Sequence, residues 1–64
     1  MITVESRTAQ PSGKVKFSLR GLQADTKPTQ TFQGEGIGNG SEFVEMDSSE
    51  IYLYDEESDT WKEF

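Results

Sequence analysis

The chain has 64 residues and a net charge of -6, and it contains neither cysteine nor histidine. A chain of this length forms one domain and buries only about 60% of its unfolded surface, so it is marginally stable without oligomerisation. The absence of Cys and His excludes disulfides, zinc sites built from these ligands and the commonest nucleophile–base pairs. We therefore expect a single domain over residues 1–64, with no enzymatic activity, no cofactor and no metal.

Two stretches near the start of the chain alternate between apolar and polar residues. Strict alternation is typical of half-buried antiparallel strands, so we predict strands at residues 1–5 and 14–20. Pro11-Ser12-Gly13 is a turn signal between them. The residues predicted to face inward are Ile2, Val4, Val15, Phe17 and Leu19.

The segment from Gly21 to Gly40 is polar and rich in Gly, Thr and Pro. A structureless loop of this length is uncommon in a small domain. Two alternatives stay open: the segment contains a short strand or helical turn, or it is a flexible loop. Its Gly34 to Gly40 run has glycine at every second position and an acidic residue inside, which favours a connector over a phosphate-binding loop.

Residues 42–64 hold the densest strand-type sequence and predict a three-stranded antiparallel meander. Its strands are expected at residues 43–46, 51–54 and 60–64, and its turns at 47–49 and 56–59. Both faces of the middle strand are apolar, because alternation separates Ile51 and Leu53 from Tyr52 and Tyr54.

These elements predict an all-β fold: a small antiparallel sheet or open barrel-like roll of four to five strands that ends in the meander. Within it, Tyr54 is expected opposite Trp61, and Ile51 opposite Phe64. The predicted core is Ile2, Val4, Val15, Phe17, Leu19, Val44, Met46, Ile51, Leu53 and Phe64.

Charge is distributed unevenly along the chain. Residues 1–33 carry five bases and two acids, whereas residues 34–64 carry one base and ten acids. This asymmetry indicates either an acidic surface that faces a partner or two halves that neutralise each other in the fold. We favour pairing between the halves.

The candidate binding residues lie in the meander. The stripe of Tyr52, Tyr54 and Trp61 is either core, a subunit interface or a platform for a protein or sugar, and core or interface is the favoured interpretation. The acidic turn around Glu57 would contact a basic partner through charge, although a solvated turn is favoured over a calcium site because the spacing of a calcium loop is absent. Its candidate residues are Glu56, Glu57 and Asp59.

Lys14, Lys16 and Arg20 on the second predicted strand are too few for nucleic-acid binding by an acidic chain. The first ten residues lack the pattern of a signal peptide, and no apolar run is long enough to span a bilayer. We therefore expect a soluble protein that binds another protein or itself, with no nucleic acid, no membrane and no small-molecule ligand.

Several separated blocks follow one another in the last two-thirds of the chain: DTKPT from Asp25, GNGSxFxEMD from Gly38, and YxYDEE from Tyr52 followed by Trp61. In this order they resemble a family of small phage and prophage proteins of Gram-positive bacteria. The resemblance implies a structural or accessory part of the particle, made in the bacterial cytoplasm and incorporated into the phage. Tyr54-Asp55 and Trp61 also resemble the outer hairpin of a kelch repeat, but one chain is too short for a propeller.

Two hypotheses result. The first is a non-enzymatic, virion-associated structural or binding module. The alternative is an acidic regulatory or inhibitory protein that binds a basic host protein through residues 42–63.

Overall fold

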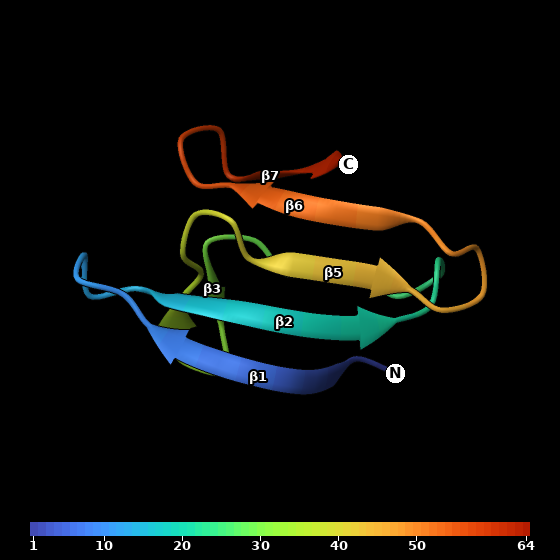
Figure 1. Cartoon of the computed structure of the whole chain (residues 1–64), viewed down its shortest axis with the longest axis horizontal. Helices are drawn as coiled ribbons and strands as arrows, with labels where there is room; N and C mark the ends of the chain where they lie inside the picture. Colours follow the sequence, from blue (N-terminus) through green and yellow to red (C-terminus); the bar gives the residue numbers. More distant parts are fainter.

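The computed structural model describes all 64 residues, as an all-β protein without helix. Five strands form one mixed sheet in the order β1-β2-β5-β6-β7, which does not close into a barrel, and two short strands form a separate hairpin (Figure 1). No segment is a helix that could cross a bilayer. The strands are β1 (Thr3–Ala9), β2 (Val15–Gly21), β3 (Thr31–Phe32), β4 (Glu35–Gly36), β5 (Glu42–Glu45), β6 (Ile51–Asp55) and β7 (Thr60–Glu63).

The first two strands form an antiparallel hairpin, as predicted. β1 begins two residues later than predicted and ends four residues later, because Ala9 still pairs with Val15 after a register shift between Val4 and Ser6. The predicted turn is present, and Gly13 adopts a positive φ of 90° that glycine tolerates.

The C-terminal meander is confirmed, since β5, β6 and β7 pair antiparallel in chain order. Tyr54 lies opposite Trp61, and the amide of Phe64 donates to the carbonyl of Ile51. The β6–β7 turn is held by Asp55, whose Oδ1 accepts a hydrogen bond from the Glu57 amide at 3.1 Å.

One strand pair departs from the predicted antiparallel arrangement. β2 and β5 run parallel, with Ser18 opposite Glu42 and Gly21 opposite Glu45. Parallel neighbours require a long crossover connection, and residues 22–41 supply it. The polar segment rich in Gly, Thr and Pro is therefore the crossover of the sheet.

The crossover folds over one face of the sheet and contains the short β3–β4 hairpin, so the alternative with a short strand is correct. Phe32 packs edge-on against Phe17 at a centroid distance of 5.4 Å. The crossover is also tied down by the indole of Trp61, which donates to the carbonyl of Pro28 at 2.7 Å. Ile37 is fully buried between crossover and sheet.

The face that the crossover covers decides which residues form the core. The predicted core is right for Phe17 and Leu19, which are fully buried, and Ile2, Val4 and Val15 pack against them. It is wrong for the meander, because the crossover lies on the side of Tyr54 and leaves the other side uncovered. The fully buried core is Phe17, Leu19, Ile37, Phe43 and Tyr54, whereas Val44 is half-buried and Met46, Ile51, Leu53 and Phe64 are exposed.

Ion pairs join the basic first half of the chain to the acidic second half. Four of the five bases before residue 34 pair with a glutamate after it, which confirms the favoured interpretation of the charge asymmetry. The pairs are Arg7–Glu35, Lys14–Glu56, Arg20–Glu42 and Lys27–Glu45.

Candidate functional site

The predicted aromatic stripe faces the crossover and belongs to the core. Tyr54 is 2% exposed, and its hydroxyl accepts from the Gln30 amide at 2.8 Å and donates to Asp59 at 2.9 Å. Trp61 packs edge-on against Tyr54 and Phe43. Burial of Tyr54 rules out a surface platform built on all three rings, and Tyr52 is half-buried beside them.

The acidic turn is largely committed to contacts within the chain. Glu56 pairs with Lys14 at 2.8 Å, and this hydrogen bond raises the pKa of Lys14. The Glu56 amide donates a hydrogen bond to the side-chain oxygen of Asn39, and Asp59 accepts one from the Tyr54 hydroxyl. Among the three predicted acidic residues, Glu57 is the one whose carboxylate lies exposed without such a contact.

The face of the sheet opposite the crossover has no cover, and we call it the open face. Cross-strand pairing arranges its side chains in rows. The first row consists of Thr3, Arg20, Val44 and Ile51, with Phe64 beyond it. The second row consists of Ser6, Ser18, Glu42, Leu53 and Lys62. The third row begins with Thr8 and Lys16.

The apolar side chains of the open face lie on its β5–β7 half, beside the charged Glu42 and Lys62. Ile51 and Leu53 are 38% and 37% exposed, although both belong to β6, which is paired on both sides. In the whole chain six large hydrophobic residues are exposed and five are fully buried. Two of the exposed residues, Met1 and Phe64, are the ends of the chain, whereas Ile51 and Leu53 lie side by side on the same face of β6.

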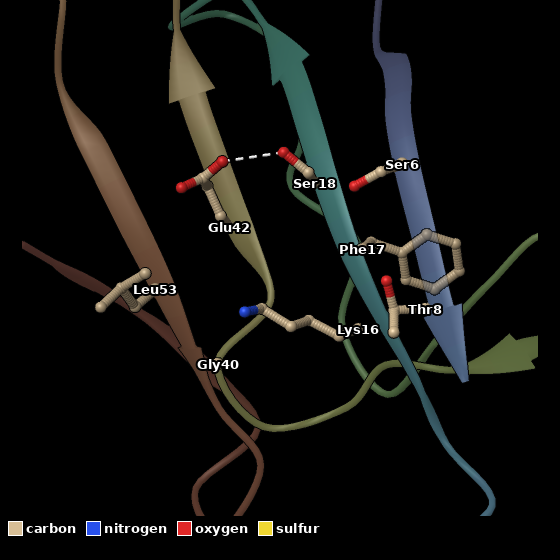
Figure 2. A pocket seen from close by; sticks show the side chains of 8 residues that line it. All are labelled: Ser6, Thr8, Lys16, Phe17, Ser18, Gly40, Glu42 and Leu53. Carbon is tan, nitrogen blue, oxygen red and sulfur yellow. Dashed lines mark hydrogen bonds between the residues drawn. The ribbon is translucent and has the colours of Figure 1, made fainter. Parts of the chain in front are cut away.

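A shallow depression of about 320 Å³ lies on the polar half of the open face (Figure 2). Figure 2 shows the Lys16 side chain reaching from β2 toward the start of β5. The depression is lined by Ser6, Thr8, Lys16, Phe17, Ser18, Gly40, Glu42 and Leu53.

The one carboxylate in this depression is already engaged. Glu42 accepts hydrogen bonds from the Ser18 hydroxyl at 2.8 Å and from the Arg20 guanidinium at 3.2 Å. These contacts, the Ser18 hydrogen bond above all, lower the pKa of Glu42. Glu42 therefore stays ionised at neutral pH while its charge is largely compensated.

Two bases on the open face form no ion pair with a carboxylate. Lys16 and Lys62 are exposed and are the only bases of the chain outside its ion pairs. Their charges contribute to the lowered pKa values of Glu42 and Asp55 without an ion pair. The open face thus offers aliphatic contact area, free ammonium groups and hydroxyls, which suits binding.

A second depression of about 260 Å³ continues the open face at one end of the sheet. It brings together three of the exposed large hydrophobics, which are Met1, Leu22 and Met46, beside Thr3, Arg20 and Gly21. No group of three or more acidic side chains is arranged to hold a metal ion.

Sequence reasoning missed the open face because both sides of β6 are apolar. One signal was available: the crossover carries Phe32 and Ile37, and a segment with two large apolar residues needs a surface to bury them. The fold and its uncovered face define a small mixed β-sheet module that is covered on one side. Comparison with known proteins gives no match to any family model, curated protein or solved structure.

Proposed function

We propose that this chain is a non-enzymatic binding module, a structural or accessory part of a phage particle, which attaches to another protein through its open face. The observation that carries the proposal is the exposure of Ile51 and Leu53 on a sheet whose opposite face is already covered by the crossover. Protein layers normally bury an apolar sheet face against a second layer. Within residues 1–64 the one covering segment, the crossover, lies on the opposite face.

The particle context rests on the resemblance of the blocks between Asp25 and Trp61 to small phage and prophage proteins. The alternative, an acidic regulator that binds a basic host protein, has less support. Two of its three proposed contact residues, Glu56 and Asp59, are engaged within the chain.

Incorporation into particles tests both parts of the proposal. Particles from a host that produces the chain are purified and the chain is quantified by mass spectrometry, for the wild type, Leu53→Lys and Gln33→Lys. Both substituted positions are exposed, so both variants should fold. We expect wild type and Gln33→Lys in the particle and Leu53→Lys strongly depleted. Wild type absent from particles would refute the virion assignment, and full incorporation of Leu53→Lys would refute docking through the open face.

A further inference from the structure

The charges of the open face point to the chemistry of its partner. Resting on the proposed function, we infer that the open face binds an extended acidic segment of another protein, in which two carboxylates flank an aliphatic side chain. The chain as a whole is acidic, with a net charge of -6. Overall charge would suggest a basic partner, but the surface that is free to bind has the opposite character.

The cations of the chain are distributed unequally over its surfaces. Arg7, Lys14 and Lys27 are neutralised by ion pairs away from the open face. Lys16 and Lys62, the two unpaired bases, both lie on it. Arg20 is paired with Glu42, so the open face is left with the free ammonium groups of Lys16 and Lys62 and with the Asp55 carboxylate near Lys62.

The two free lysines lie on opposite sides of Leu53, with Glu42 between Leu53 and the strand of Lys16. Leu53 lies opposite Lys62 on one side and opposite Glu42 on the other. Lys16 stands across the sheet, two residues before Ser18, which is the residue opposite Glu42. β2 and β7 are three strand spacings apart in the sheet order, which is about 14 Å.

An extended peptide matches this spacing. Side chains at positions i, i+2 and i+4 of a strand point the same way and span about 13 Å. A segment with acid, aliphatic and acid at these positions would place its carboxylates near Lys16 and Lys62 and its aliphatic side chain on Leu53. Long lysine side chains accommodate the offset along β2.

The depression beside Lys16 completes one of the two carboxylate contacts. Ser18 already donates to Glu42, so Ser6 and Thr8 are the lining hydroxyls that remain to donate to a carboxylate beside the Lys16 ammonium. A protein segment fits better than nucleic acid, because the open face lacks a row of aromatic rings on which bases stack.

A titration of the full chain tests the inference. The ¹⁵N-labelled protein is mixed with the end-blocked peptide Ser-Glu-Thr-Leu-Thr-Glu-Ser, and amide shifts are followed by NMR. We expect saturable shifts around Lys16, Leu53 and Lys62. Replacing both peptide Glu residues by Gln should weaken binding about tenfold, since two exposed charge pairs are lost. The double variant Lys16→Gln/Lys62→Gln should show the same loss, and Arg7→Gln should bind like the wild type.

Other results would overturn the inference in recognisable ways. Equal binding of the Gln peptide at the same amides would refute an acidic partner while leaving the open face as the binding surface. Tighter binding of a thymidine oligonucleotide would indicate a polyanion site. Concentration-dependent shifts of the open face without peptide, with a dimer mass by light scattering, would show that a second copy covers it. If no peptide shifts the open face and Leu53→Lys still enters particles, the proposed function fails as well.

Discussion

The ammonium group of Lys27 lies 2.5 Å from the carboxylate of Glu45, and both side chains are largely withdrawn from solvent, at 17% and 2% exposure. The same ammonium stands 4.8 Å from the ring centroid of Phe43 and 4.4 Å from that of Tyr52. This contact joins the crossover to β5, because Lys27 precedes the β3–β4 hairpin and Glu45 ends the strand. The pair thus fastens the covering segment over the sheet.

Removing the cation alone should destabilise the fold. Lys27→Met leaves the buried Glu45 carboxylate with only the Ser48 hydroxyl as a partner, and uncompensated buried charges are costly. We expect the thermal midpoint to fall by several degrees, and the double variant Lys27→Met/Glu45→Met to recover most of the loss. Lys14→Met, which breaks a pair with side chains 42% and 33% exposed, serves as the control and should change little. Equal midpoints for Lys27→Met and Lys14→Met would contradict this role.

The hydroxyl of Tyr54 should matter for stability, whereas that of Tyr52 should not. The Tyr54 hydroxyl connects the Gln30 amide of the crossover to Asp59 in the β6–β7 turn. Its loss in Tyr54→Phe should cost about 1 kcal/mol in the free energy of unfolding. Chemical denaturation of Tyr54→Phe beside Tyr52→Phe measures the difference, and a larger loss for Tyr52→Phe would show that the bridge is unimportant.

Ser41 should be required for the start of the parallel strand pair. Its buried hydroxyl accepts from the Phe17 amide at 3.0 Å and donates to the Gly38 carbonyl at 2.8 Å. The Ser41 hydroxyl therefore provides a hydrogen-bond acceptor for the β2 backbone at Phe17, one residue before β2 begins to pair with β5. Ser41→Ala leaves the buried Phe17 amide without this acceptor, at a cost of about 1–3 kcal/mol. The Gly38 carbonyl keeps the Ser41 amide as a donor. Denaturant melts against the exposed control Ser49→Ala check this, and similar stabilities of the two would disprove it.

Stability should pass through a maximum in mildly acidic solution. Hydrogen bonding to Glu63 and repulsion from its charge raise the pKa of Glu50 above its ordinary value of 4.5. A carboxyl whose pKa is raised by folding destabilises the fold when ionised, so stability rises as the pH falls through that pKa. The carboxyls with lowered pKa values stabilise the fold when ionised, and this contribution is lost as the pH falls from their ordinary values, 3.8 for Asp and 4.5 for Glu, through the lowered ones. These carboxyls are Asp25, Glu42, Glu45 and Asp55.

The variant Glu50→Gln isolates the first of these two effects. It should lose the gain in stability on mild acidification and keep the loss in stronger acid. Thermal melts across the acidic range make the comparison, and an unchanged gain in Glu50→Gln would show that another group is responsible.

Much of the fold follows from local sequence pattern. The alternation around Phe17 and the β-branched and aromatic run at Ile51 predict β2 and β6, and the turn expected at residues 56–59 predicts the last hairpin. These features depend on residues within a few positions of one another, so they can be recognised in the sequence alone.

The features that sequence reasoning missed depend on distant contacts. The parallel pairing of Leu19 with Phe43 spans the crossover, and no short pattern encodes it. The orientation of β6 could not be settled from Ile51 and Tyr52, because both faces of that strand are apolar. Two hydrogen bonds hold the crossover over the face that carries Tyr54 and so set the orientation of β6. They join the Trp61 indole to the Pro28 carbonyl and the Gln30 amide to the Tyr54 hydroxyl. The open face, and with it the candidate site, became recognisable only once the covered side was known.

The most direct test of the account asks which side of the sheet meets a partner. A photocrosslinking amino acid is placed at Leu53 on the open face or, as a matched control, at Gln33 in the β3–β4 turn, and each protein is irradiated in producing cells and in purified particles. We expect a discrete crosslink to a particle protein from position 53 and none from position 33. Crosslinks from position 33 alone, or equally from both positions, would contradict the open face as the docking surface.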